Sequence, residues 1–269
     1  AAFAAAAGSQ PVDLNLSLVH NPESGGIYVC LGDGVGLPYL FLYDPVNDHL
    51  IQVGAFVGQG VAIHPRIAPD GSLMRLVPGA QPRIEKLLPA GGRILIELPR
   101  EIAGQLAEGD CGASIISPAG EYCILTGGML YRIAPSGQVS LTALEATKDW
   151  TIYEMGFGPD PDLLYLYVNR NEPTDANIWL MRCRLSTGEF EELAYLGHSH
   201  LFDFVMYEYH VPGLLADGEN GKLYFNRSER LPDLDREQLA LWIYEPGLGE
   251  RMIGYWSGVN VWSEQLTLL

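Results

Sequence analysis

Short runs of apolar residues, broken by glycine, proline, aspartate and asparagine, recur along the whole chain. The run at 67–76, IAPDGSLMRL, places a Pro-Asp-Gly turn between two apolar segments, which is typical of a β-hairpin. Looser versions lie at 116–125 (ISPAGEYCIL), 156–167 (GFGPDPDLLYLY) and 214–225 (LLADGENGKLYF). Helical periodicity is scarce. The pattern therefore predicts an all-β protein built from many short antiparallel strands.

A second hairpin with a polar turn usually follows each of these hairpins, so the strands come in groups of four. The groups end near residues 56, 98, 145, 197 and 257, a repeat of about 40 to 60 residues. A four-stranded sheet with two apolar faces cannot bury both alone, so such sheets pack face to face around an axis. We therefore expect a β-propeller of five four-stranded blades. Six blades is the competing count, and a β-sandwich is the alternative fold.

The expected propeller forms one domain over residues 12–269. Its blades are predicted at 12–56, 60–98, 111–145, 150–197 and 203–257. The remaining segment, 259–269, is predicted to be one more strand that closes the ring by completing the blade at the other terminus, which would remove an open sheet edge. The alanine-rich segment 1–11 lacks an initiator methionine and is expected to be tag-like or disordered.

One turn carries a family resemblance. Ala68-Pro69-Asp70-Gly71, followed by a second hairpin, resembles the TolB-type (PD40-like) propeller repeat, in which a Ser-Pro-Asp-Gly turn joins the first two strands of each blade. The resemblance implies a propeller, an architecture also found in WD40-like proteins. Proline presets φ in such a turn, aspartate can bond its own backbone, and glycine tolerates a positive φ. The other turns depart from the pattern: Ser117-Pro118-Ala119-Gly120, Gly158-Pro159-Asp160-Pro161 and Ala216-Asp217-Gly218-Glu219.

Charge and cysteine content limit which binding partners and which cellular compartment we expect. The chain has 33 acidic and 16 basic residues, a net charge of -17. Nucleic acid is excluded as the main partner because its phosphates would be repelled, and a basic protein or a cation would be attracted. We expect no membrane insertion, because long apolar stretches are missing. The four cysteines show no C-x-x-C spacing and are expected to be buried free thiols, which favours the cytoplasm over the periplasm or secretion.

Sequence motifs for catalysis are missing. There is no nucleophile elbow, phosphate-binding loop or H-E-x-x-H motif, so no catalytic residue is assigned and no cofactor is expected beyond a divalent metal. Metal candidates are His198, His200 and Asp203, because the two histidines would share one face of a strand. On the predicted inner strands only Glu154 and His64 depart from the apolar pattern, which is too few to define a mechanism.

Two polar insertions, 169–177 and 226–238, both follow the second strand of a blade and both begin with Asn-Arg. Loops between the second and third strands emerge on one rim of a propeller, and long polar loops on a rigid scaffold commonly carry binding residues. The candidate partner-binding residues are therefore Arg170, Glu172, Asp175, Arg227, Glu229, Arg230, Asp233 and Asp235.

These observations favour a non-catalytic binding protein, in which the propeller contacts a protein partner through loops on one face. An inhibitor or immunity-type role is one form of this hypothesis, and the oligomeric state is left open. One alternative is a propeller hydrolase or lyase with a central carboxylate or metal site. Another is a module that binds a glycan or a small ligand. A central channel lined by converging Asp, Glu or His residues would favour catalysis.

Overall fold

The computed structural model describes residues 15–255 with internal gaps. The gaps are 21–26, 33–38, 45, 56–65, 78–80, 90–91, 100–101, 103–112, 159, 171–176, 199–213, 217–221 and 231–236. The segment 1–11 and the expected closing strand 259–269 lie outside the described residues, so both stay predictions.

The first two sheets each consist of four consecutive strands. The first sheet contains β1 (Asn15–His20), β2 (Ile27–Gly32), β3 (Tyr39–Asp44) and β4 (His49–Ala55). The second contains β5 (Arg66–Ile67), β6 (Leu73–Val77), β7 (Arg83–Leu87) and β8 (Arg93–Glu97). Each strand pairs antiparallel with the next one along the chain.

The other three sheets repeat this meander. The third contains β9 (Ser114–Ile116), β10 (Tyr122–Thr126), β11 (Met129–Ile133) and β12 (Val139–Ala143). The fourth contains β13 (Trp150–Phe157), β14 (Leu163–Arg170), β15 (Asn177–Arg184) and β16 (Glu189–His198). The fifth contains β17 (Leu214–Ala216), β18 (Leu223–Arg230), β19 (Glu237–Glu245) and β20 (Gly249–Tyr255).

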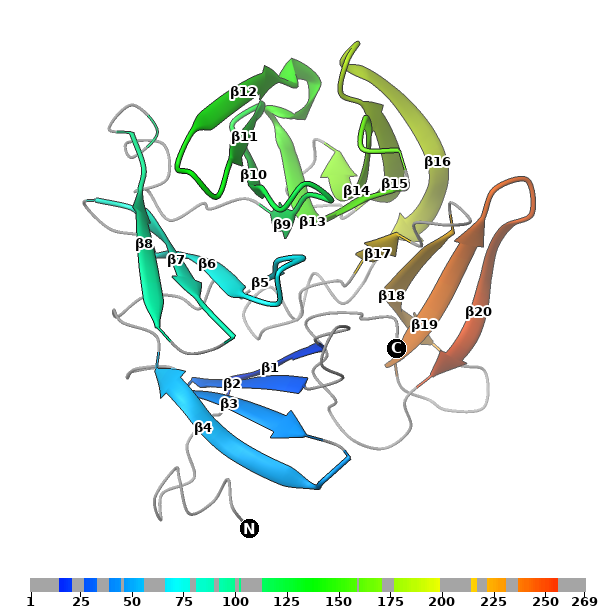
Figure 1. The fold of residues 1–269 in the computed structure, drawn as a ribbon. Coiled ribbons are helices and arrows are strands. Elements are labelled where there is room, and N and C mark those ends of the chain that lie inside the picture. Colours follow the sequence, from blue (N-terminus) through cyan, green and yellow to red (C-terminus); the bar gives the residue numbers. More distant parts are fainter. Residues whose placement is uncertain are drawn as a thin grey trace.

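The five sheets stand around a common axis as the blades of a propeller (Figure 1). The first strand of each blade, here called its inner strand, lies nearest the axis, and the fourth lies at the outside. Inner strands of successive blades touch, with β1 against β5, β5 against β9, β9 against β13, and β13 against β17. The predicted all-β propeller of five four-stranded blades is confirmed. No helix within the described residues is long and apolar enough to cross a lipid bilayer.

The repeated turn has the same hydrogen bonds in the second and third blades. In the second blade, Gly71 N–H donates to Ala68 O at 2.8 Å, and Ala68 N–H donates to Ser72 O at 2.8 Å. Ser117 and Gly120 make the matching pair of bonds in the third blade. Gly71 and Gly120 have φ of 74° and 80°, which residues with a side chain rarely adopt. The shared geometry explains why the glycine stays while the aspartate changes to Ala119.

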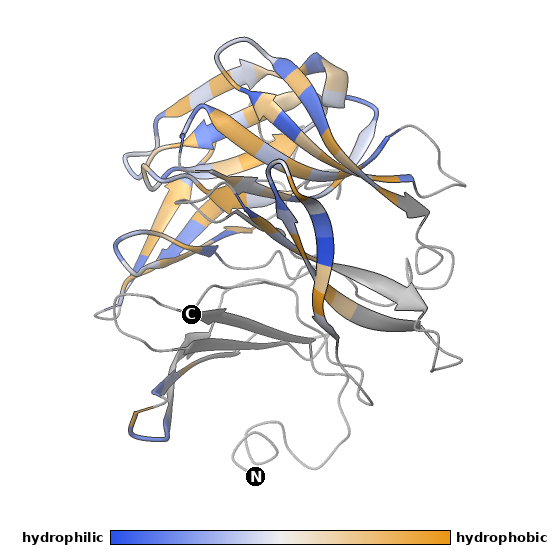
Figure 2. Cartoon of the chain, turned by 90° about the vertical axis from the view of Figure 1, so that its right-hand side faces the viewer, coloured by the Kyte–Doolittle hydropathy of each residue, from blue (hydrophilic) through white to orange (hydrophobic). Residues whose placement is uncertain are grey.

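Side chains of one blade alternate between its two neighbours. On β14, Leu164 and Leu166 belong to the core shared with the third blade, whereas Tyr165 and Tyr167 belong to the core shared with the fifth. This follows from the two-residue period of a strand, which sends successive side chains to opposite faces of the sheet. Figure 2 shows many hydrophobic positions along the described strands. The third and fourth blades therefore bury both of their faces, as the propeller prediction requires.

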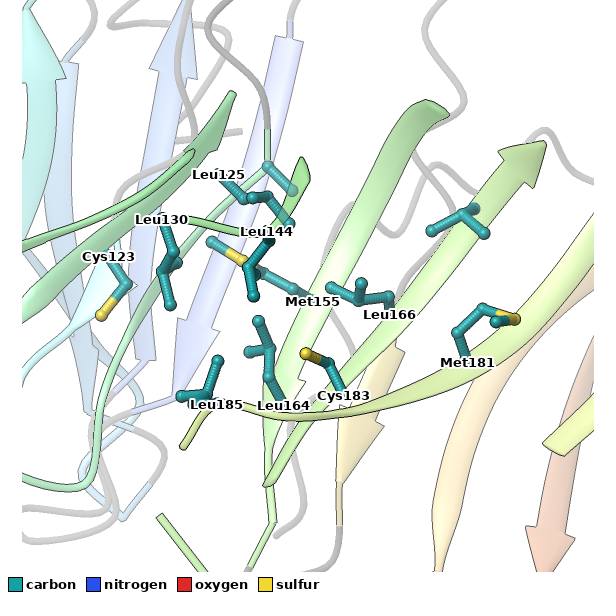
Figure 3. Packing of buried hydrophobic residues seen from close by; sticks show 12 residues of the cluster. Cys123, Leu125, Leu130, Leu144, Met155, Leu164, Leu166, Met181, Cys183 and Leu185 are labelled. Carbon is teal, nitrogen blue, oxygen red and sulfur yellow. The ribbon is translucent and has the colours of Figure 1, made fainter. Parts of the chain in front are cut away.

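The third and fourth blades share a cluster of buried hydrophobic side chains (Figure 3). Its buried side chains include Cys123, Leu125, Leu130 and Leu144 from the third blade, and Met155, Leu164, Leu166, Met181, Cys183 and Leu185 from the fourth. Cys123 and Cys183 are free thiols, as predicted for these two positions.

A tyrosine links the second and third blades at their inner side. Strand β5, as described, pairs with Leu73 and Met74 of β6. The hydroxyl of Tyr122, on β10, accepts a hydrogen bond from Leu76 N–H at 3.1 Å and donates to the hydroxyl of Ser114 at 3.2 Å. One side chain thus connects β6 of the second blade with β9 and β10 of the third.

Candidate active site

An ion pair between two inner strands lies at the axis of the propeller. Arg66 on β5 belongs to the second blade, and Glu154 on β13 belongs to the fourth. Nη2 of Arg66 donates to Oε1 of Glu154 at 2.8 Å and to Oε2 at 3.0 Å. The third blade stands between the other two, and its inner strand β9 contacts both β5 and β13 (Figure 1). Only the central region of a propeller allows side chains of non-adjacent blades to meet in this way.

A β-bulge aims Glu154 at this position. Along β13, Ile152 pairs with Val168 and Glu154 pairs with Tyr167, so Tyr153 is an extra residue without a partner in the ladder. Without the bulge, strict alternation would turn Glu154 toward the hydrophobic core that Met155 occupies. The extra residue shifts the phase by one position, so Met155 enters that core and Glu154 is released from it. Bulges that redirect a side chain in this way are common beside active sites.

Both members of the pair are largely buried. The side chain of Glu154 is 2% exposed and that of Arg66 is 14% exposed. Oε1 of Glu154 also accepts a hydrogen bond from Met155 N–H at 3.1 Å, which holds the carboxylate against its own strand. In contrast, Nε of Arg66 is buried and has no hydrogen-bond partner in the part of the chain that the structure describes. A buried donor without a partner is uncommon in native proteins, and such a group calls for a physical explanation.

Aromatic side chains hold the bulge from the fifth-blade side. The rings of Tyr153 and Tyr167 meet edge to face, with ring centroids 6.1 Å apart. The ring of Tyr167 also packs against that of Phe225 in the fifth blade, with ring centroids 6.2 Å apart. Burial raises the pKa of Tyr153, and a hydrogen bond that its hydroxyl accepts from the Asn169 side-chain amide partly offsets this rise. The phenol therefore stays protonated at neutral pH. The bulge is packed from one side, so the direction of the Glu154 side chain is well defined.

The arrangement offers two chemical functions side by side. A carboxylate held by a guanidinium can accept a proton as a general base. The guanidinium can stabilise negative charge that develops on a reacting group. Sequence reasoning singled out Glu154 as a polar exception but missed Arg66. The available signal was an arginine within the apolar inner-strand segment VAIHPRI, directly before the Pro-Asp-Gly turn. His64, the other exception, lies outside the described residues.

Arg170, a predicted partner-binding residue, is held by neighbours of its own blade. Its guanidinium lies 5.4 Å from the ring centroid of Trp150 and 5.0 Å from that of Trp179, and it forms an ion pair with Glu192. Trp179 in turn stacks on Tyr195, with ring centroids 4.6 Å apart. The side chain of Arg170 is 30% exposed, so much of its surface is already used within the fourth blade.

The other predicted contact residues are not brought together by described side chains. Arg227, Glu229 and Arg230 lie on β18, and only their backbone positions are described. Glu172, Asp175, Asp233 and Asp235 lie outside the described residues. The two Asn-Arg pairs do not occupy equivalent places, because Asn169-Arg170 ends β14 whereas Asn226-Arg227 lies in the middle of β18. In both blades the residue before the pair lies opposite a tryptophan, Trp179 or Trp242.

Only one residue of the predicted metal site, His198, belongs to the described part of the chain. His198 is the last residue of β16 and pairs with Asn177, whereas His200 and Asp203 lie outside the described residues. Among the residues that the structure describes, no group of three or more His, Cys, Asp or Glu side chains could hold a metal ion. Metal binding by the trio stays a prediction.

Comparison with known proteins finds likeness in structure and not in sequence. No protein-family model matches the sequence, and no curated protein matches it. An oligogalacturonate lyase in complex with manganese superposes with a TM-score of 0.55 at 12% identity, over 89% of this chain and 64% of the lyase. The gluconolactonase XC5397 from Xanthomonas campestris gives 0.56 at 14% identity, over 96% and 84%. A puromycin hydrolase gives 0.51 at 14% identity, over 93% and 40%.

These likenesses establish the propeller fold, and they correct the functional expectation. The chain spans less than two thirds of the length of the lyase that it matches. The expectation of a non-catalytic binding scaffold is wrong, because the similar structures include a lyase, a hydrolase and lactonases. The expectation was based on the polar loops, whose charged residues are adjacent in the sequence and therefore easy to recognise. The ion pair at the axis joins residues that are 88 positions apart, so the sequence did not relate them. The comparisons favour the enzymatic alternative, with this chain as a relative of propeller enzymes in fold.

Proposed function

We propose that the protein is a propeller hydrolase or lyase whose reaction takes place at the axis. Glu154 acts as the general base, and Arg66 stabilises the negative charge that forms on the substrate. The observation that carries this proposal is the buried ion pair from inner strands of two non-adjacent blades. The bulge that directs Glu154 to the axis supports it.

Two reaction types share the same first step at this site. In a hydrolysis, Glu154 takes a proton from water while the hydroxide oxygen bonds to a carbonyl carbon, and Arg66 stabilises the resulting oxyanion. In an elimination, Glu154 takes a proton from carbon, and Arg66 stabilises the carbanion before the leaving group departs. The names of the similar structures include a lactonase and a lyase of acidic sugars, so sugar lactones and acidic sugars are the first substrates to test.

The turn at Ala68-Pro69-Asp70-Gly71 supports a place close to TolB-type propellers within this architecture. The third blade keeps the same turn hydrogen bonds with a changed sequence, which suggests that the repeat geometry is shared beyond the one matching motif. The metal candidates His198, His200 and Asp203 would add to the axial site only if they approach it, and the proposal rests on the carboxylate alone.

The proposal is tested by comparing Glu154→Gln with the wild-type protein on sugar lactones and uronate oligosaccharides. Ring opening releases acid, and elimination creates an ultraviolet-absorbing double bond, so both reactions are followed directly. Loss of the base should lower kcat/KM by about 100- to 10,000-fold. The matched control is Glu191→Gln, which removes a half-exposed carboxylate paired with Arg182 on the outer part of the fourth blade. Full activity of Glu154→Gln, or an equal loss in Glu191→Gln, would overturn the proposal.

A further inference from the structure

The guanidinium of Arg66 has donors left over after it binds Glu154. An arginine carries five N–H donors, and both hydrogen bonds to Glu154 come from Nη2. Nε is buried and makes no hydrogen bond to any described residue. Nε shares one edge of the guanidinium with Nη2, so an oxygen that binds Nε–H would lie beside the carboxylate of Glu154. The unsatisfied Nε–H is therefore a donor that an incoming carboxylate could use.

The exposure of the two side chains indicates which of them meets a ligand first. Arg66 is 14% exposed, whereas Glu154 is 2% exposed. Among the inner strands as described, Arg66 is also the only lysine or arginine. In a chain with a net charge of -17, Arg66 is thus the cation that the described inner strands offer to a ligand anion. An anion held there would lie beside the carboxylate of Glu154.

We infer that Arg66 binds a carboxylate group of the substrate, so the protein acts on small organic acids of the sugar-acid type. This inference rests on the proposed function of the same site and names its substrate class. The guanidinium is then shared between Glu154 and the ligand. Arg66 thereby recognises the acid group and places the neighbouring carbon or carbonyl within reach of the base.

Matched pairs of ligands test the inference without any need for turnover. Each pair has an acid and its neutral counterpart: galacturonate with galactose, glucuronate with glucose, and gluconate with sorbitol. Binding is measured by isothermal titration calorimetry, with inorganic phosphate as a separate arm. The wild-type protein should bind at least one acid about tenfold or more tighter than its neutral counterpart. Equal affinities in all three pairs, or tighter binding of phosphate than of every acid, would overturn the inference.

Variants separate this inference from the proposed function. Arg66→Gln should abolish the preference for acids, and Arg66→Lys should weaken it while keeping the positive charge, because an ammonium cannot bind Glu154 and a ligand through separate nitrogens as a guanidinium can. Arg182→Gln, which removes a partly exposed arginine of the fourth blade, should leave the preference unchanged. Persistence of the preference in Arg66→Gln would contradict the inference.

Glu154→Gln distinguishes the two failures. This variant should still prefer acids while losing turnover, because it keeps Arg66. If it keeps turnover, the proposed base is wrong although acid binding can stand. If the wild-type protein turns over a neutral substrate through Glu154 and prefers no acid, the substrate class is wrong although the base can stand.

Discussion

Asp70 in the second-blade turn shows how one side chain serves two neighbours. Its Oδ1 accepts a hydrogen bond from Ser72 N–H at 3.1 Å, and its Oδ2 pairs with Nζ of Lys86 at 2.6 Å. Lys86 lies on β7 with its side chain only 10% exposed, so Asp70 supplies its counter-charge. Burial alone would raise the pKa of Asp70, but the hydrogen bonds from Lys86 and Ser72 outweigh this effect and lower the pKa to about 2. The third-blade turn lacks this carboxylate and has no such linkage.

The pH dependence of stability follows from this lowered pKa. The unfolded chain binds a proton at Asp70 near the ordinary aspartate pKa of 3.8, whereas the folded chain does so only near 2. The stabilisation is therefore complete above about pH 5 and is lost as the pH falls from about 5 toward 2. Because the side chain of Asp70 is 54% exposed, solvent screening reduces the effect.

Asp70→Asn provides the test at the residue scale. The variant keeps a side chain suited to the turn but loses the charge, so its melting temperature should lie below that of the wild-type protein at pH 6. The difference should shrink steadily between about pH 5 and pH 2.5. Melting curves followed by circular dichroism give both temperatures. A difference that stays constant over this range would show that the charge of Asp70 does not stabilise the fold.

At the scale of a strand, the bulge in β13 is the feature that makes an axial site possible. A regular strand of the same sequence would send Glu154 into the apolar core with Leu164 and Leu166. Tyr153 takes up the extra position and is held by Tyr167 and Asn169. The strand therefore has one residue without a ladder partner, and as a result the charged side chain of Glu154 lies outside the apolar core.

Deletion of Tyr153 should have a large effect on stability. The shortened strand must either bury Glu154 without Arg66 or expose Met155, and breaking a buried ion pair commonly costs about 3–5 kcal/mol. The free energy of unfolding in urea measures the loss. Tyr153→Phe is the matched control, because it keeps the extra residue and the ring contact and removes only the hydroxyl. A deletion variant as stable as this control would mean that the bulge does not position Glu154.

At the scale of the whole molecule, the described hydrophobic cores lie between blades. The cores that the structure describes each draw side chains from two successive blades. Cys123 on the third blade and Cys183 on the fourth lie in the same inter-blade core (Figure 3). Burial raises the pKa of each thiol to about 12. Reagents can reach either sulfur only when the two blades separate.

Alkylation by iodoacetamide tests this view of blade packing. With pKa values near 12 instead of 9, the thiolate fraction at pH 8 is about a thousandfold lower, and burial slows the reaction further. In the native protein Cys123 and Cys183 should therefore label slowly and at similar rates, whereas both should label quickly in urea. Peptide mapping by mass spectrometry follows each site separately. Rapid labelling of one thiol while the other stays protected would show that the blades do not open as a unit there.

The sequence by itself determined the architecture. Turn residues recurring every 40 to 60 residues, with apolar runs between them, specify four-stranded sheets with two hydrophobic faces, and such sheets must pack around an axis. The turn at Asp70 could be predicted in detail because its proline, aspartate and glycine act locally. The burial of Cys123 and Cys183 followed from the apolar runs around them.

Only the tertiary structure decided where the polar groups meet. Arg66 and Glu154 are 88 residues apart in the sequence, and their ion pair depends on two inner strands reaching the same axis. The strand period alone would have buried Glu154 in the wrong core, because a bulge leaves no signal in the hydrophobic pattern. Arg170, prominent in a polar loop, is instead held between Trp150 and Trp179. The periodicity of a strand indicates which of its faces is apolar. The candidate site depends instead on contacts between strands of different blades, and periodicity within one strand does not predict those contacts.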